Sequence, residues 1–365
     1  MGKQILTNEQ QLLVLTSKLT FNNDDYDKIK ELAMSNINWF DFFKLALYHK
    51  VENLTWVNLN TIIPNIKIPK HLNEVLQFIY LSTKQQNELY QKETTRIINL
   101  LRENHITCIP VKGANLIPNL YKDFGLRHMS DIDLIVKYEN NKTIEKVMEQ
   151  DGYLKGDYDR KGNIITPVSR LNDVKWKMSM SNMYPFRKLY NSEILKCIKI
   201  DFRYSLDDSL NQDAVNEMID TYESNSNIDE SFLLTHLCTH FFDEAKHTVS
   251  VVRGKDLNLI KLCDIREFVL KHKNQNLLEK AIKFSTKHNL REQIYYTMYF
   301  LDKVYCDGYE KDVLHKLQLQ NISFVNSFGD SSLNSDQEFK KDFWERLFSC
   351  NNDDELSDSP KYYKI

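Results

Sequence analysis

The sequence predicts an α+β protein in which a small mixed sheet is flanked by an N-terminal and a C-terminal helical region. Before residue 106 and again beyond residue 210, apolar residues recur at the three-to-four spacing of amphipathic helices. Between these regions, short apolar runs and stretches of alternating polarity are typical of strands. Glycine (9) and proline (7) are scarce in 365 residues, which favours long helices. We therefore expect four parts: 1–106, an N-terminal helical region; 107–208, the α/β core; 209–324, a C-terminal helical domain; and 325–365, a linker, a short helix and an acidic tail.

The N-terminal region is expected to contain several short helices followed by a long one. The segments "NEQQLLVLTSKL", "DDYDKIKELAMS" and "NWFDFFKLALYHK" each carry Asn or Asp near the start, a residue type that caps helices. Residues 70–104 follow Pro69 and have the pattern of one amphipathic helix, whose apolar stripe would pack on neighbouring helices. The stripe consists of Leu72, Val75, Phe78, Ile79, Leu89, Ile97 and Leu101.

The core is expected to follow the order β-α-β-α-β-β-β. Its first four elements are a strand at "CIPVKG", a short helix at "ANLIPNLYKD", a strand at "SDIDLIVKY" and a capped helix that closes near Gly152. Alternating polarity then predicts three more strands, at "NIITPV" (163–168), "VKWKMSM" (174–180) and "ILKCIKIDFRYSL" (194–206).

Helical spacing returns after residue 210. Four stretches have it: "IDESFLLTHLCTHFFDEAKH", "DLNLIKLCDIREFVLKH", "NLLEKAIKFSTKH" and "LREQIYYTMYFLDKVY". Residues 325–337 are polar enough for a linker, and the segment after Ser349 is acidic and expected to be frayed.

Composition excludes several classes of protein. The net charge of −3 gives no overall field for DNA or an anionic membrane, so neither is expected as a partner. No apolar stretch approaches membrane-span length and the start lacks the apolar run of a signal peptide. The six cysteines are scattered without a CxxC pair, as expected for free thiols in a reducing compartment, and we expect a cytoplasmic protein. No P-loop, G-x-G-x-x-G, G-x-S-x-G or Cys-His signature is present, which argues against the common kinases, dehydrogenases and hydrolases.

The segment "SDIDLIV" carries the clearest chemical signal. On a strand, Asp131 and Asp133 point to the same face, while the alternate apolar residues face a core. Two adjacent carboxylates resist joint ionisation unless a cation lies between them. Between Lys155 and Tyr204 there are 11 Lys or Arg against 5 Asp or Glu, and in the predicted strand 174–180 Lys175 and Lys177 share a face. Acids beside bases suit a metal–triphosphate site, although a solvated strand face explains the lysines equally well.

Three segments together resemble a known family. "IPVKGANLIPNLY", "GLRHMSDIDLIV" and "IKIDFRYSL" are similar to the uncharacterised bacterial nucleotidyltransferases of the DNA polymerase β-type superfamily. The resemblance implies transfer of an NMP from an NTP, such as ATP, to a hydroxyl acceptor, with release of pyrophosphate and with Mg²⁺ or Mn²⁺ as cofactor. The acceptor would be a small molecule or a peptide natural product. Arg203 stands two residues after the third acid, where we expect a histidine, and this leaves the acceptor side open.

The resemblance also implies which residues act. The catalytic residues and metal ligands would be Asp131, Asp133 and Asp201. The resemblance places Lys112, Gly113 and Arg127 at the nucleotide. Further candidates for nucleotide contact are Ser130 and, from the basic segment, Lys175 and Lys177.

Other readings of the sequence remain open. A non-catalytic nucleotide- or partner-binding module of the same fold is one alternative, and an RNA-modifying toxin-type nucleotidyltransferase is another. His236 and His240 are one helical turn apart, but without a third ligand they are better explained as core or groove-lining residues. Asp264 and Arg266 either reach the cleft or pair across helices. The sequence does not indicate the oligomeric state.

Overall fold

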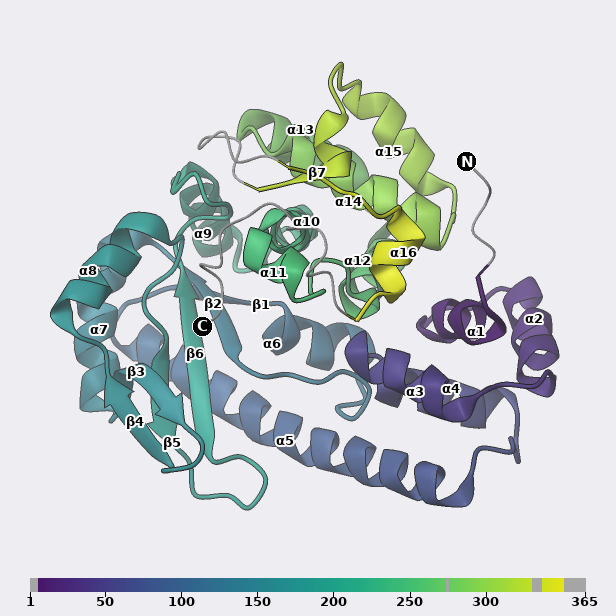
Figure 1. Cartoon of the computed structure of the whole chain (residues 1–365). Helices are drawn as coiled ribbons and strands as arrows, with labels where there is room; N and C mark the ends of the chain where they lie inside the picture. Colours follow the sequence, from purple (N-terminus) through teal and green to yellow (C-terminus); the bar gives the residue numbers. More distant parts are fainter. Residues whose placement is uncertain (1–5, 274–275, 330–336, 351–365) are drawn as a thin grey trace. The chain divides into compact units, whose positions relative to one another are not determined.

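The computed structural model describes residues 6–273, 276–329 and 337–350, and the chain divides into two compact units. Unit 1 comprises Met1–Leu76 and Leu237–Ile365, and unit 2 comprises Gln77–His236. The six-stranded sheet lies in unit 2, and helices precede and follow it in the chain, so the α+β class is confirmed (Figure 1). The four-part division expected from the sequence stays a prediction. No helix in the described ranges is both long and apolar enough to cross a membrane.

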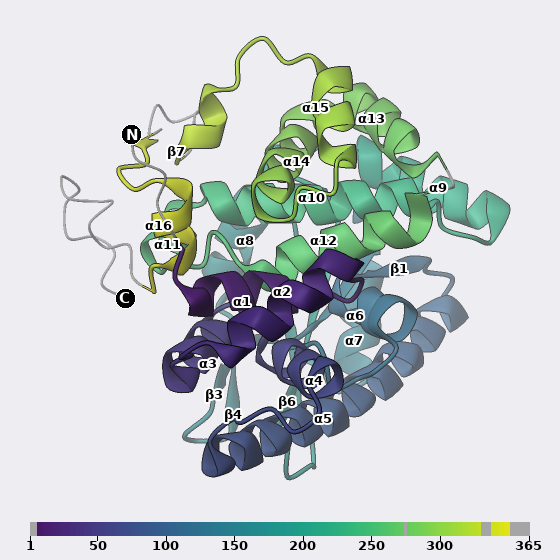
Figure 2. The ribbon, with the colours of Figure 1, turned by 90° about the vertical axis from the view of Figure 1, so that its right-hand side faces the viewer.

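The first half of unit 1 is a group of four short helices. They are α1 (Asn8–Thr16), α2 (Asn23–Met34), α3 (Trp39–Tyr48) and α4 (Glu52–Ile62). Thr7 and Asn22 each begin a capping box, which satisfies free N–H groups in the first turns of α1 and α2. The helices pack against one another through their apolar faces, with α1 contacting the other three (Figure 2). The predicted helical spacing is confirmed here.

The second half of unit 1 is also helical. Its elements are α11 (Thr248–Val252), α12 (Leu259–His272), α13 (Leu277–Lys287), α14 (Arg291–Val304), α15 (Tyr309–Leu317), the 3₁₀ turn η4 (Ser323–Asn326), β7 (Ser327–Phe328), β8 (Gln337–Glu338) and α16 (Phe343–Phe348). Most of the predicted linker and nearly all of the predicted acidic tail lie outside the described residues. Arg266 is buried and forms ion pairs with Glu267 and Asp307; its Nε lies 2.6 Å from Asp307 Oδ2. These ion pairs give Arg266 a structural role within this unit.

Unit 2 is built around the sheet. The strands are β1 (Cys108–Val111), β2 (Ile132–Val136), β3 (Leu154–Asp159), β4 (Ile164–Pro167), β5 (Phe186–Leu189) and β6 (Cys197–Arg203). Their order is β1-β2-β6-β5-β3-β4, and every neighbouring pair is antiparallel except β2 and β6, which are parallel. The remaining elements are α5 (Lys70–Glu103), α6 (Gly113–Leu116), the π-helical turn η1 (Ile117–Tyr121), the 3₁₀ turn η2 (Tyr138–Asn140), α7 (Asn141–Gln150), α8 (Arg170–Ser179), α9 (Asp213–Asn225) and α10 (Glu230–Lys246). Helix α5 begins, and α10 ends, in unit 1.

The two central strands separate a core from a polar face. Ile132, Leu134 and Val136 of β2 join one buried apolar cluster with alternate residues of β6. Asp133 and the buried Ile135 lie on the opposite face of β2. Helices α5 and α7 cover this side of the sheet and contribute buried residues such as Ile97 and Ile144 to the same cluster (Figures 1 and 2). The predicted single long helix at 70–104 is confirmed as α5, but Val75 and Phe78 of its predicted apolar stripe are exposed.

Two predictions within the core are wrong. Residues 174–179 belong to helix α8, and Met180 is its C-cap, because Ser169 caps the segment and Asp173 pairs with Lys177 one helical turn later, at 3.1 Å. Its alternation of polar and apolar residues therefore does not reflect a strand. Strands β3 and β5 were not expected, since both are short and carry few apolar residues. In β3, Gly156 allows a close approach of β4, since a Cβ there would lie 2.2 Å from the carbonyl oxygen of Thr166.

Candidate active site

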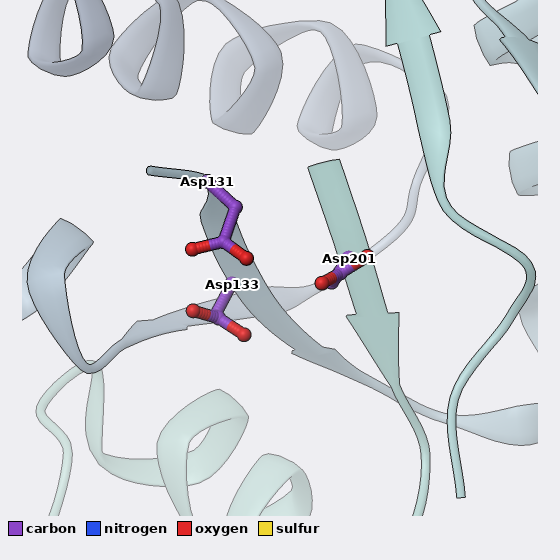
Figure 3. Close-up of side chains that lie close together, drawn as sticks. All are labelled: Asp131, Asp133 and Asp201. Atoms are coloured by element: carbon purple, nitrogen blue, oxygen red, sulfur yellow. The ribbon is translucent and has the colours of Figure 1, made fainter. Parts of the chain in front are cut away.

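Three carboxylates converge on the polar face of strands β2 and β6. Asp131 directly precedes β2, Asp133 lies within it, and Asp201 lies within β6. The register pairs Asp133 with Asp201, so that both side chains occupy neighbouring positions on one face. One oxygen from each carboxylate lies within 4.8 Å of the others (Figure 3). We call Asp131, Asp133 and Asp201 the carboxylate cluster; among the described residues it is the one group of acids, His and Cys close enough to hold a metal ion.

Two lysines neutralise much of the cluster's charge. The Lys112 ammonium lies 2.7 Å from Asp133 Oδ1. The Lys199 ammonium lies 2.9 Å from Asp131 Oδ2 and 2.6 Å from Asp201 Oδ2, and so bridges these two carboxylates. Lys199 is two residues before Asp201 on β6, so it shares that face of the strand. Each acid of the cluster therefore has a cationic partner.

The acids of the cluster nevertheless differ in their pKa. Burial would raise the pKa of Asp131, but the charges of Lys199 and Lys112 outweigh it and lower the pKa to about 2. Burial raises the pKa of Asp201, and the negative charges of Asp131 and Asp133 raise it further. Together they outweigh the Lys199 ammonium, which lowers the pKa, and the result is a pKa of about 6. The cluster thus holds one carboxylate that is stabilised in its ionised form and one that is destabilised.

These residues fit a divalent cation. The second oxygen of Asp201, Oδ1, is buried and has no hydrogen-bond partner among the described residues. An ionised carboxylate oxygen without a partner is costly in a protein interior unless a cation or water approaches it. Mg²⁺ and Mn²⁺ prefer carboxylate oxygens and complete their coordination with water or phosphate oxygens. The donor set and the unpartnered oxygen are therefore what such an ion requires.

The turn between β1 and α6 borders the cluster. Lys112 adopts φ 48° and ψ −129°, a backbone conformation that residues other than glycine rarely adopt. A Cβ on the next residue, Gly113, would lie 2.9 Å from Arg127 Nη1 and 3.1 Å from Met129 Cγ. The Arg127 guanidinium therefore lies directly against the glycine backbone. The structure brings Lys112, Gly113 and Arg127 together, as their predicted shared role in nucleotide binding requires.

Helix α5 holds the loop that leads into β2. Asn87 Nδ2 donates to the carbonyl oxygens of Phe124 and Arg127, at 2.6 and 2.7 Å. The Tyr90 hydroxyl donates to the carbonyl oxygen of Ser130 at 2.9 Å, and the Ser130 hydroxyl donates to Asp131 at 3.1 Å. The buried face of α5 thus fixes the backbone on which Arg127, Ser130 and Asp131 stand.

Lys175 and Lys177 have different surroundings from those expected. On α8, Lys177 pairs with Glu145 at 2.8 Å and with Asp173 at 3.1 Å, and Lys155 joins both acids. Lys175 is exposed on the same helix. Neither Lys175 nor Lys177 forms an ion pair with the carboxylate cluster within the described ranges. Their role in nucleotide binding stays a prediction.

Sequence reasoning missed Lys199. The signal was present in "KID", because a lysine two residues before an acid on a strand shares its face. His236 is buried, and burial, together with the charges of Arg203 and Lys112, lowers its pKa well below the usual value, as for a core histidine. Arg203 donates to the Ser181 hydroxyl at 2.9 Å.

The fold and the cluster together define the class. A parallel strand pair with an Asp-x-Asp on one strand and a third Asp on the other, beside a Lys-Gly turn, is the arrangement that the resemblance to nucleotidyltransferases implies. A family model described as uncharacterised nucleotidyltransferase matches residues 35–305. The chain belongs to this family, and it is a transferase on that basis. No curated protein and no solved structure matches the chain.

Proposed function

We propose that this protein transfers an NMP from an NTP to a hydroxyl group and releases pyrophosphate, with Mg²⁺ or Mn²⁺ as cofactor. The observation that supports it most is the carboxylate cluster, in which the β2–β6 register gathers three acids around a buried, unpartnered oxygen. Family membership supports nucleotidyl transfer as the reaction type. A bound divalent cation would neutralise phosphate oxygens and align the attacking and leaving groups for an in-line displacement.

The protein's own residues would perform the remaining tasks. Asp131, Asp133 and Asp201 would hold the cation, and Asp201 would also orient the acceptor hydroxyl and accept its proton. Lys112 and Arg127 would donate to the phosphates, since a guanidinium and an ammonium are the usual partners of phosphate oxygens. The missing Cβ of Gly113 leaves the space that the Arg127 guanidinium occupies.

The acceptor is proposed to be a small molecule or a peptide, and ATP is proposed among the donors. A cytoplasmic location is supported by the six cysteines, all of which are free thiols, three of them buried. Three acids placed together argue against a non-catalytic module that binds only a protein partner, because such a module has no need of a cation at this position. A non-catalytic nucleotide-binding module is distinguished by the measurement below.

The reaction is tested by measuring pyrophosphate release. The protein is incubated with each NTP, Mg²⁺ and fractions of candidate hydroxyl compounds and peptides, and products are identified by the mass of an added NMP. Asp133→Asn serves as the inactive control. We expect metal-dependent pyrophosphate and an NMP adduct from wild type alone. Tight nucleotide binding without pyrophosphate under any condition, including slow hydrolysis with water as acceptor, would favour the non-catalytic module.

A further inference from the structure

Lys199 occupies the position at which two acids of the cluster would share a cation. Its ammonium lies 2.9 Å from Asp131 Oδ2 and 2.6 Å from Asp201 Oδ2. This placement follows from the sheet: Lys199 and Asp201 are alternate residues of β6, and the parallel register carries Asp131 alongside Lys199. Lys199 and Asp201 therefore stand on a strand, and Asp131 is the residue directly before β2, at the end of the loop that α5 holds.

The charges in the site leave room for one divalent cation. Three carboxylates carry three negative charges, and the ammonium groups of Lys112 and Lys199 carry two positive charges, so one negative charge remains. One divalent cation would turn this into a single positive charge, which suits an anionic triphosphate. The bound triphosphate adds several negative charges of its own, which positive charge in the site must also balance. The ammonium groups of Lys112 and Lys199 together supply two positive charges, as many as a second divalent cation would bring.

The supply of oxygens agrees with the charge count. Lys199 engages Oδ2 of both Asp131 and Asp201, and Lys112 engages Oδ1 of Asp133. The Ser130 hydroxyl donates to the other oxygen of Asp131 at 3.1 Å. The buried Oδ1 of Asp201 is left without a partner among the described residues, and it is an open position for a cation. Oδ2 of Asp133 is a second oxygen that the same cation could take, because the Lys112 ammonium engages Oδ1.

We propose that the Lys199 ammonium replaces a second divalent cation, so that the site holds one metal ion and Lys199 supplies the other positive charge beside the phosphates. This inference rests on the proposed function, since it describes how the same site handles the charge of an NTP. In the proposed reaction Lys199 is then a catalytic residue that contacts the reacting phosphate.

The test counts bound Mn²⁺ by electron paramagnetic resonance in protein saturated with a non-hydrolysable NTP analogue. We expect one Mn²⁺ per wild-type chain and two in Lys199→Met, in which a side chain of similar length has no charge. Lys199→Arg keeps the charge and should bind one. Lys196→Met is the matched control, because Lys196 is exposed just before the same strand, and it should also bind one.

Two results would overturn the proposal: two Mn²⁺ ions in wild type, or one in a folded Lys199→Met variant. The number of Mn²⁺ ions bound to wild type tests the proposal even if Lys199→Met does not fold. No Mn²⁺ in wild type would instead refute the proposed function itself, so the two failures are distinguishable.

Discussion

Asp133 of β2 and Asp201 of β6 are direct partners across the parallel strand pair at the centre of the sheet. A shift of one residue in this register would place Asp201 on the core side, where Ile200 and Phe202 are fully buried. The apolar residues of both strands thus determine where the acids lie. The chemistry of the site depends on the packing of the core beneath it.

The two acids that Lys199 bridges should respond in opposite directions to neutralisation. In metal-free protein at pH 7.5, Asp201→Asn should raise stability, because burial and the neighbouring acids raise the pKa of Asp201 and ionisation is unfavourable there. Asp131→Asn should lower stability, because Lys199 and Lys112 outweigh burial and lower the pKa of Asp131. The free energy of unfolding should change by about 1–3 kcal/mol in each variant, as expected for pKa shifts of this kind. Urea unfolding in EDTA measures the stability of both variants. If both were more stable than wild type, or both less stable, the assigned electrostatics would be contradicted.

The stability effect of Asp201→Asn should depend on pH. A carboxyl whose pKa is raised to about 6 takes up a proton in the folded state before the unfolded chain does, near its ordinary value of 3.8. The penalty of ionised Asp201 is therefore complete above pH 6 and is lost progressively as pH falls from about 6 to 3.8, so the advantage of Asp201→Asn should shrink between pH 7.5 and 5. Asp131 has a folded pKa of about 2, so its contribution is lost only below about pH 4, and the deficit of Asp131→Asn should persist at pH 5. An advantage for Asp201→Asn that stays constant with pH would refute the raised pKa.

The backbone of Lys112 is expected to be strained. Lys112→Gly and Lys112→Met both lose the ion pair with Asp133, but glycine adopts φ 48° without a steric penalty. We expect Lys112→Gly to be more stable than Lys112→Met by about 1–2 kcal/mol. Lys137 is the control, since it also pairs with an acid but has φ −71°, and there the glycine variant should be the less stable one. Chemical denaturation measures the stability of the four variants. If the glycine and methionine variants had the same order of stability at both positions, the backbone of Lys112 would not be strained.

Gly113→Ala should act through Arg127. The new Cβ would meet Arg127 Nη1 at 2.9 Å, and the flexible guanidinium would move at little cost to stability. Nucleotide-analogue affinity should fall about tenfold, the size of one lost charge-assisted contact. Arg127→Met should have a similar effect, and the double variant should bind no more weakly than Arg127→Met alone. Additive losses in calorimetric titrations would show that the glycine acts independently of the arginine.

Variants of Lys177 and Lys175 should distinguish a structural role of these lysines from a role in nucleotide binding. Lys177→Met should lower stability by about 1 kcal/mol, because Glu145 and Asp173 lose a partly buried partner. Lys175→Met should leave stability unchanged, since Lys175 is exposed. If the two lysines contact the nucleotide, as the sequence predicts, each variant should lose about tenfold in nucleotide affinity. Unchanged affinity in calorimetric titrations of both variants would contradict that role.

Local patterns were sufficient to predict much of the structure. The long helix α5 and the strand at Ile132–Val136 depend on residues close together in the sequence, and the family resemblance depends on three short segments. The side-by-side placement of Asp131 and Asp133 follows from strand geometry alone.

Features that depend on distant partners were not predictable. The parallel register that pairs Asp133 with Asp201 joins residues 68 positions apart, and no local pattern encodes it. Lys199 was missed because its importance comes from Asp131 on the neighbouring strand. Helix α8 was mistaken for a strand because its Ser169 cap and its contacts with Glu145 outweigh a short alternation of polar and apolar residues.

Metal-dependent nucleotide binding by the carboxylate cluster is tested most directly by calorimetric titration of a non-hydrolysable NTP analogue. Wild type is titrated in Mg²⁺ and in EDTA, beside Asp133→Asn, which removes one acid of the cluster. We predict binding in Mg²⁺ that weakens at least about a hundredfold in EDTA, and an Asp133→Asn variant in which Mg²⁺ makes little difference. Equal affinity of wild type with and without Mg²⁺, or full metal dependence in folded Asp133→Asn, would contradict the assignment of this cluster as the metal and nucleotide site.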